Sequence, residues 1–293
     1  MRGAALACAP ALFVFLWSTG WISARAAVID SDPLTFLAAR FSCALVVFTC
    51  LAVLMRAPWP ARGIDTVHAM VSGVLLHAIY LGGVWWAVGQ GVPAGISGVI
   101  AATQPILTAL LAPMLIRERI SGKQWSGILL GLAGVLVVLW PRLAAAQGAD
   151  FAKLNVALAV NLFGMLAVTL GTFYQKRFIP TADLRTTATL QYAGAVVPTL
   201  LAAWWLEPAM RLTISWTSIA TMLWSVLAIS LGAIMLYLWL IRNGAVSRAA
   251  SLIYLVPAAT ALEAWALFGE QLWPIQMLGI AITVAGVALA TRK

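Results

Sequence analysis

The chain has 293 residues, of which 63% are hydrophobic and 9% are charged. A soluble protein carries roughly a quarter charged residues, and one core could not bury this much apolar surface, so the composition excludes a soluble globular protein and indicates that lipid solvates part of the chain. The net charge of +9 does not indicate nucleic-acid binding, because the basic residues lie between apolar runs rather than in one cluster.

Ten apolar runs are each long enough to cross a hydrocarbon core about 30 Å thick, which takes about 20 helical residues. They cover residues 6–27, 34–55, 68–89, 94–116, 123–140, 155–176, 186–206, 217–241, 246–267 and 274–291. The first run superficially resembles a signal peptide, but its length predicts a retained span. Pro274 falls in the first turn of the last run, where proline is tolerated. The sequence therefore predicts an all-α polytopic membrane protein with ten transmembrane helices.

The basic residues alternate between the two sides of this arrangement. With the N-terminus in the cytoplasm, most of the 18 Lys and Arg fall in cytoplasmic loops, and Arg40 lies within a span. The outer side receives Arg25, Arg142, Lys153 and Arg211. This asymmetry follows the positive-inside rule. It predicts a multi-pass protein of a bacterial inner membrane with both termini in the cytoplasm.

An internal repeat organises the chain. Four pairs of residues are each separated by 152 positions without a gap: Pro105 and Pro257, Glu118 and Glu270, Gly127 and Gly279, and Gly134 and Gly286. Self-similarity at fixed spacing indicates a repeat architecture. We expect a first five-helix repeat at 1–141, an outer connecting loop at 142–153 and a second five-helix repeat at 154–293.

Each repeat holds five spans, an odd number, so the second repeat enters the membrane in the opposite orientation to the first. Inverted-topology repeats are typical of secondary transporters, in which two near-equivalent halves open a central site to either side in turn. The repeat therefore favours a transporter.

The residues that form this repeat also resemble a known family. Gln104-Pro105, Glu118-Arg-Ile-Ser and Gly131-x-x-Gly134-Val135 resemble an EamA domain, and Pro257, Gly269-Glu270 and Gly286-Val287 resemble a second one. Two EamA domains are typical of ten-helix members of the drug/metabolite transporter superfamily, and the aromatic-rich spans look most like the bacterial aromatic amino acid exporters. The resemblance implies a central substrate cavity lined by the first, third, fourth, sixth, eighth and ninth helices, with the fifth and tenth peripheral.

Pro105 and Pro257 lie within the fourth and ninth spans at equivalent positions. A proline inside a helix removes one backbone hydrogen bond, and interrupted helices at matched positions of two repeats indicate a transporter binding site. A kink that lets the helices cross would give the same pattern. With Gln104, the two prolines are candidate substrate-binding residues.

His77 is the ionisable residue nearest the middle of a span, and Tyr80 shares its helical face. Ionisable groups inside a membrane usually have a function, so His77 is expected to donate to a substrate carboxylate or to relay protons. A neutral imidazole bonded to a neighbouring helix is the structural alternative.

Arg40 and Glu263 both lie several residues inside the outer ends of their spans. Each is unfavourable alone in a membrane, so a possible intramembrane ion pair between them is expected. Snorkelling of Arg40 to the outer headgroups is the alternative.

Several aromatic residues in the spans could stack on a planar substrate or hold a cation. The candidates are Trp17, Trp21, Trp85, Tyr237 and Tyr254. Packing or lipid contact explains any single one equally well. The three cysteines, Cys8, Cys43 and Cys50, have no CxxC spacing or neighbouring histidine, and are expected to be small buried hydrophobic residues.

Other functions are less well supported. Gly95-Ile96-Ser97-Gly98 matches the GxSG motif of rhomboid proteases, but no histidine follows His77. A multidrug or quaternary-cation exporter would need a buried carboxylate, for which Glu263 is the candidate, and a nucleotide-sugar carrier would need deep basic residues. The sequence has neither a Walker A motif nor a clustered metal site, so we expect no enzyme activity, metal or cofactor.

The sequence thus predicts a secondary transporter that exports aromatic and other hydrophobic amino acids by alternating access. Its expected partners are a small-molecule amino acid substrate and the lipid bilayer, with no nucleic acid, and we expect a monomer.

Overall fold

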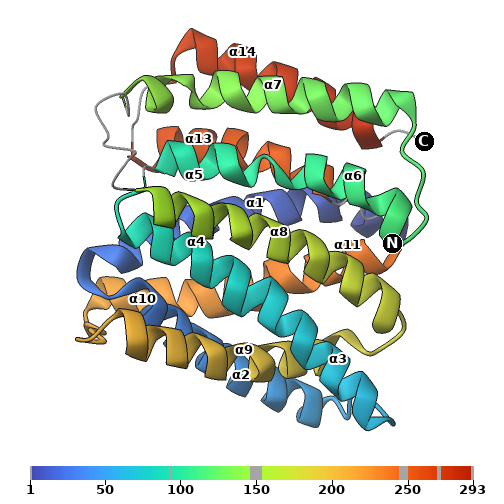
Figure 1. The fold of residues 1–293 in the computed structure, drawn as a ribbon, viewed down its shortest axis with the longest axis vertical. Helices are drawn as coiled ribbons and strands as arrows, with labels where there is room; N and C mark the ends of the chain where they lie inside the picture. The colour runs from blue at the N-terminus through green and yellow to red at the C-terminus, as the bar shows by residue number, and fades with distance from the viewer. Residues whose placement is uncertain (1, 93, 146–153, 244–249, 269–271, 292–293) are drawn as a thin grey trace.

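A computed structural model describes the whole chain except residues 1, 93, 146–153, 244–249, 269–271 and 292–293. The described residues form ten helical rods that lie side by side (Figure 1). In chain order the rods are α1 Arg2–Asp30; α2 Pro33–Leu54; α3 Gly63–Gly73 with the π-helical segment η1 Val74–Ile79 and α4 Tyr80–Gly89; α5 Ala94–Ala101 with α6 Gln104–Leu115; α7 Gly122–Ala145; α8 Asn155–Phe178; α9 Leu184–Leu206; α10 Trp216–Trp224 with the π-helical segment η3 Ser225–Ala233 and α11 Ile234–Asn243; the 3-10 turn η4 Leu252–Tyr254 with α13 Leu255–Phe268; and α14 Pro274–Thr291. The predicted all-α fold with ten spans is confirmed.

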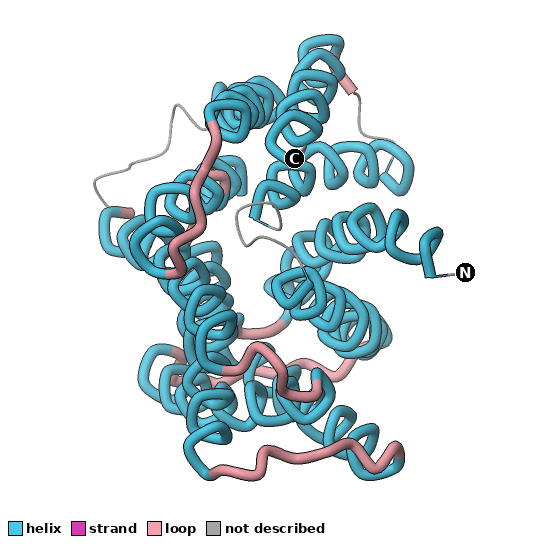
Figure 2. The backbone as a smooth tube through the Cα atoms, turned by 90° about the vertical axis from the view of Figure 1, so that its right-hand side faces the viewer, coloured by secondary structure: helices cyan, strands magenta, loops and turns pink. Residues whose placement is uncertain are grey.

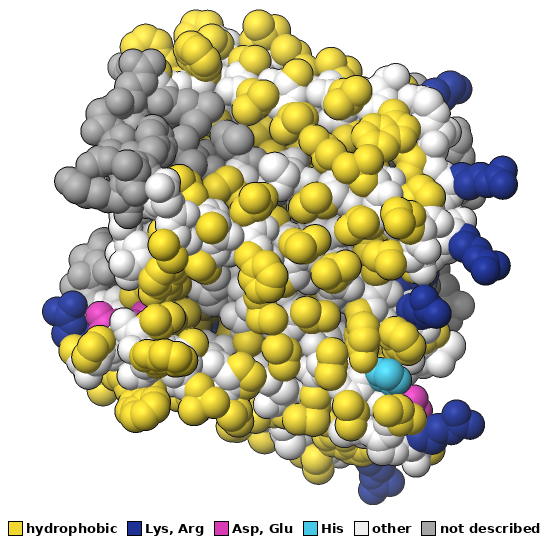
Figure 3. All heavy atoms as spheres, viewed as in Figure 1, with side chains coloured by type: hydrophobic (Ala, Val, Ile, Leu, Met, Phe, Trp, Pro, Cys, Tyr) yellow, Lys and Arg dark blue, Asp and Glu magenta, His cyan; other side chains and the backbone are white. Residues whose placement is uncertain are grey.

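The surface of the bundle fits a lipid environment. Six helical segments of the described chain are long and apolar enough to cross a membrane, and shorter apolar helices lie within the first, fourth and ninth rods. Apolar side chains cover most of the face shown in Figure 3. Lys and Arg gather mainly at the edge where Figure 1 places both ends of the chain, as the alternation of basic loops predicted. Figure 2 views the bundle from that edge, where short loops join the rods.

Two local expectations differ from the structure. Helix α7 continues through Pro141 to Ala145, so the first residues of the expected loop at 142–153 are helical and the others lie outside the described chain. A single proline removes only one helical hydrogen bond, and neighbouring helices of a membrane bundle tolerate that loss. Cys43 and Cys50 are exposed on α2 rather than buried, because they lie on the face of α2 opposite its buried residues Phe41, Ala44 and Phe48.

The packing of the rods follows the repeat. Helix α7 packs along α14, and α2 packs along α9, so equivalent helices of the two halves form pairs. The third and fourth rods pack on α8, which is the first helix of the second repeat. The equivalent eighth and ninth rods pack on α1, which is the first helix of the first repeat. Exchanging the two halves therefore reproduces the same set of contacts, which is what an inverted repeat about a two-fold axis in the membrane requires.

Glycines hold α7 and α14 at close range. A Cβ atom on Gly127 would lie 2.4 Å from the Ala290 nitrogen, and one on Gly286 would lie 2.4 Å from the Gly131 nitrogen. Small residues let membrane helices approach closely enough for their backbones to touch. The repeated glycines of the sequence are therefore contacts of one helix pair, which lies at the edge of the bundle (Figure 1).

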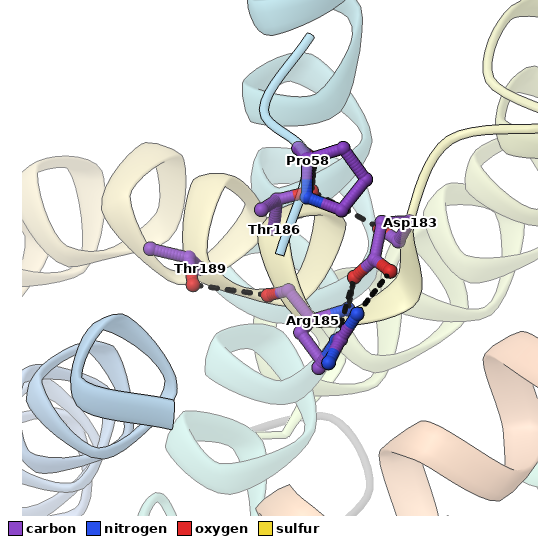
Figure 4. A network of polar contacts seen from close by, with 5 residues as sticks. All are labelled: Pro58, Asp183, Arg185, Thr186 and Thr189. Carbon is purple, nitrogen blue, oxygen red and sulfur yellow. Dashed lines mark hydrogen bonds and ion pairs between the residues drawn. The ribbon is translucent and has the colours of Figure 1, made fainter. Parts of the chain in front are cut away.

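The ends of α2 and α9 are tied together by side-chain caps. Asp183 accepts a hydrogen bond from the Arg185 backbone at 2.8 Å and pairs with its guanidinium at 2.8 Å, so the pKa of the Asp183 carboxyl is lowered. Thr186 donates to the Pro58 carbonyl at 3.1 Å, which joins α9 to the segment after α2 (Figure 4). At the opposite end, Glu207 follows α9 and accepts the backbone N–H groups of Leu34 and Thr35 at 2.7 and 2.8 Å. A carboxylate suits the positive N-terminal end of a helix.

Candidate functional site

The third and eighth rods both change to π-helix in their middle. Shifting η1 by the repeat offset places it at residues 226–231, inside η3. π-helical segments interrupt the regular hydrogen-bond ladder and often occur at functional sites. His77 lies in η1, and Tyr80 is the first residue of the helix that follows, α4. No residue pattern in the sequence marked these two segments, since they lack proline.

The fourth and ninth rods are interrupted at the repeated prolines. Helix α5 ends at Ala101 and α6 begins at Gln104, with Pro105 in its first turn. In the ninth rod the 3-10 turn η4 gives way to α13 at Leu255, two residues before Pro257. Proline in the first turn of a helix has no N–H to leave unpaired. The predicted interruption is thus present in both halves, while a substrate role for these prolines stays a prediction.

One polar and aromatic cluster lies where the first, third, fourth and eighth rods meet. The Trp17 ring contacts the Tyr237 ring at 5.4 Å between centroids, and both contact Phe13, at 5.2 and 5.5 Å. The Gln104 amide donates to the Tyr237 hydroxyl at 3.4 Å, and the Tyr80 hydroxyl lies beside the Trp17 indole. The structure brings together four of the predicted residues, Trp17, Tyr80, Gln104 and Tyr237. We call these four residues the aromatic cluster.

A second cluster lies between the second, third, seventh and eighth rods. The His77 imidazole stacks on the Tyr192 ring with centroids 4.6 Å apart and planes 2° apart, and Phe41 packs at 5.8 and 5.7 Å from the two rings. Arg40, on α2, donates through Nε to the Ser230 hydroxyl of η3 at 3.2 Å. Sequence reasoning did not single out Tyr192 or Ser230. The repeat offset applied to Arg40 gives Tyr192, a signal that could have found it.

The expected ion pair between Arg40 and Glu263 is wrong. Arg40 bonds to Ser230, whereas the Glu263 carboxylate accepts a hydrogen bond from the Ser18 hydroxyl of α1. The reason is the position of α1, which packs on both α13 and η3. Glu263 therefore faces α1, while Arg40 reaches η3 from the other side. Arg40 is 2% exposed, so it does not extend to the headgroups either.

The other candidate residues lie apart from the two clusters. Trp85 stacks on Phe36 of α2 at 5.9 Å between centroids, within a hydrophobic core. Tyr254 is fully buried and packs over Gly131 of α7, so it faces the peripheral helix pair. The side chain of Trp21 lies outside the described residues.

The serine of the GxSG match has a structural partner. Ser97 is buried and accepts a hydrogen bond from the Asn161 amide of α8 at 2.8 Å. His77 instead stacks on Tyr192, and neither of its ring nitrogens has a hydrogen-bond partner in the described chain. The geometry of a serine nucleophile with its histidine base is therefore not formed here. The described residues also hold no group of three or more His, Cys, Asp or Glu that could bind a metal.

Comparison with known proteins identifies the family. The sequence model of the EamA-like transporter family matches residues 1–140 and again residues 155–292. The chain belongs to the EamA-like transporter family. It is therefore a membrane transporter rather than an enzyme, and the two family matches fall on the two halves of the bundle.

Several known proteins are similar to this chain over nearly its whole length. The uncharacterized transporter YvbV of Bacillus subtilis is 26% identical over 97% of this chain and 90% of its own length. The uncharacterized inner membrane transporter YedA of Escherichia coli is 27% identical over 96% and 88%. A probable amino-acid metabolite efflux pump of Escherichia coli is 23% identical over 94% and 91%. One solved crystal structure is similar with a TM-score of 0.76 at 21% identity, over 99% of this chain and 98% of that one, a likeness that shows the fold alone.

Proposed function

We propose that this transporter exports amino acids, aromatic and other hydrophobic ones, by alternating access. The observation that carries the proposal is the aromatic cluster at the interrupted fourth helix. Two rings and two polar groups from four different rods meet there, namely Trp17, Tyr237, Tyr80 and Gln104. Indole and phenol rings stack on planar side chains, and the amide and hydroxyl groups can orient the polar end of a substrate.

The relatives support this substrate class. One protein similar over nearly the full chain is named a probable amino-acid metabolite efflux pump. Direction and substrate class pass to this chain by analogy, and the cluster is the feature of this chain that an aromatic amino acid would fit. The substrate is a small molecule, so the bilayer and the amino acid are the proposed partners of a monomer.

The packing suggests how access would alternate. The first rod contacts the eighth and ninth, and the sixth contacts the third and fourth, so each repeat lends one helix to the other half. A rocking motion that opens one side would separate one of these groups and close the other. The aromatic cluster includes helices from both repeats, and such a motion would expose it to each side in turn.

Counterflow into proteoliposomes tests the proposal. Purified protein in vesicles preloaded with unlabelled phenylalanine is expected to accumulate labelled phenylalanine without an imposed ion gradient. Unlabelled tyrosine and tryptophan outside should abolish the signal. Absence of uptake, with inward and with outward proton gradients as well, would refute the amino acid proposal.

Glu263 favours a second candidate function, export of organic cations. Its carboxylate is buried, and its Oε2 atom has no hydrogen-bond partner in the described chain. A buried carboxylate without a countercharge attracts a cation or a proton. Export of a quaternary ammonium compound that Glu263→Gln abolishes would support this function. Absence of such export by the wild type would exclude it, and unchanged export by the variant would exclude Glu263 as the cation site.

We also propose that both termini face the cytoplasm of a bacterium. YedA is an inner membrane transporter by name, and the basic edge of the bundle carries both ends of the chain. Reporter fusions at each terminus that report a periplasmic location would contradict this orientation.

A further inference from the structure

The guanidinium of Arg40 is a buried cation with few partners. Arg40 is 2% exposed, and its one described hydrogen bond runs from Nε to the Ser230 hydroxyl. A guanidinium has five N–H donors, so four of them have no partner among the described residues. A buried charge without hydrogen bonds and a countercharge is strongly unfavourable. The stability of the fold therefore does not explain why an arginine occupies this position.

No carboxylate of the described chain serves as its counterion. Three described acidic residues in or beside the second, seventh and ninth rods have other partners. Glu207 accepts three hydrogen bonds at the start of α2, Asp32 pairs with Arg211, and Glu263 accepts from Ser18. Among the described residues the guanidinium of Arg40 therefore has no countercharge.

The surroundings of Arg40 offer more unused polar groups. Both ring nitrogens of His77 are buried without a hydrogen bond, and the side chain of Gln191 on α9 lies beside the imidazole with its own Oε1 atom unpartnered. His77 stacks on Tyr192, and the Arg40 guanidinium and the Tyr192 hydroxyl both lie beside the Ser230 hydroxyl. These groups form one polar site inside the bundle, which joins the π-helical segments of both repeats.

The site also includes residues at equivalent positions of the two repeats. Arg40 and Tyr192 are separated by the repeat offset of 152 residues, and they lie on α2 and α9, which pack against each other. Equivalent residues that meet in this way lie near the two-fold axis of an inverted repeat. A ligand held there is contacted by both halves in either conformation.

We propose that Arg40 binds the carboxylate of the transported molecule, with Ser230 as the residue that positions its guanidinium and His77 as a second donor. The proposal rests on the proposed function, since it assigns the carboxylate of an amino acid to this site. A planar guanidinium matches a carboxylate with two parallel hydrogen bonds, which a water molecule or chloride cannot reproduce.

Binding of three ligands tests the site: phenylalanine, 3-phenylpropionate, which lacks the amine, and phenethylamine, which lacks the carboxylate. The purified wild-type protein is expected to bind the two carboxylates and to bind phenethylamine far more weakly. Arg40→Gln should weaken binding of both carboxylates roughly ten- to a hundredfold, the effect of losing charged hydrogen bonds, and leave phenethylamine unchanged. A variant that keeps the wild-type preference for carboxylates would overturn the proposal.

Two further variants guard against loss of folding. Arg40→Lys keeps the charge but not the paired donors, and it should bind both carboxylates with intermediate affinity. Ser230→Ala should weaken the binding of phenylalanine severalfold and leave the binding of phenethylamine unchanged. Arg211→Gln, which removes a positive charge at the exposed end of α2, is the matched control and should bind all three ligands as the wild type does. Wild-type affinities in both Arg40→Lys and Ser230→Ala would overturn the proposal even if Arg40→Gln does not fold.

The same panel separates this proposal from the proposed function. Binding of 3-phenylpropionate that depends on Arg40, together with no binding of phenylalanine, would retain the carboxylate site and refute the amino acid substrate. Equal binding of all three ligands by the wild type would refute the carboxylate site, whether or not phenylalanine is transported.

Discussion

The imidazole of His77 lies parallel to the phenol ring of Tyr192, with 4.6 Å between their centroids. This stack joins the π-helical segment of the third rod to α9, and Phe41 closes it from α2. Packing therefore fixes the ring of His77, while its two nitrogens have no partner in the described chain. The shape and the polarity of this residue can be tested separately.

His77→Phe should keep the stack and the thermal stability, but slow transport of phenylalanine at least about tenfold, because the N–H donor of the imidazole is lost. His77→Ala should lower both stability and transport, because it also leaves a cavity. Melting curves in detergent and initial rates of counterflow measure the two effects. Wild-type rates in His77→Phe would leave His77 with a packing role only.

Tyr237→Phe removes the hydroxyl that accepts the Gln104 amide and keeps the ring against Trp17. We expect KM for phenylalanine to rise roughly two- to tenfold, the effect of one neutral hydrogen bond, with little change in the amount of folded protein. Trp85→Phe is the matched aromatic control, since Trp85 packs on Phe36 away from the aromatic cluster. Equal effects of the two variants would argue against the aromatic cluster as the binding site.

Glu207→Ala should destabilise the contact between α2 and α9, because the first turn of α2 loses acceptors for Leu34, Thr35 and the Thr35 hydroxyl. Removing a helix cap costs about 1–2 kcal/mol. Glu207→Gln keeps an acceptor and should lose less. Thermal unfolding measures both, and a melting temperature unchanged in Glu207→Ala would show that water replaces the cap.

Gly286→Val should prevent α7 and α14 from packing, since even a Cβ at this position would overlap the backbone of Gly131. Loss of monodisperse protein in size-exclusion chromatography is the expected result. Gly122→Ala is the control on α7, because a Cβ at Gly122 meets no atom within 4 Å. Normal folding of Gly286→Val would mean that this helix pair can separate without loss of the fold.

Much of the fold follows from the sequence. An apolar run of about 20 residues has to satisfy its backbone groups internally within a bilayer, so it forms a helix. The predicted ranges accordingly agree with the rods, from Pro33–Leu54 to Pro274–Thr291. The matched spacing of Pro105 and Pro257 also indicated where two helices are interrupted, because a proline has no backbone N–H to donate to the helical hydrogen-bond ladder.

The sequence did not determine which polar side chains meet. Contacts between rods depend on how each helix is rotated about its axis and on which helix lies between two others. The hydropathy of the sequence locates the spans but gives neither the rotation nor the neighbours. Arg40 and Glu263 looked like partners from their depth alone, yet α1 separates them, and each bonds to a serine of another rod. The stack of His77 on Tyr192 likewise depends on the π-helical segment η1, which shifts the side chains of the third rod relative to a regular α-helix.

The sequence by itself determined the membrane environment, the ten helices and the inverted repeat, because these depend on apolar length and on spacing along one chain. The tertiary structure decided the two polar clusters, because they form only where helices far apart in sequence pack together. Arg40 shows the difference most clearly. Its place in the second span is a property of the sequence, whereas its isolation from every described carboxylate is a property of the packed bundle.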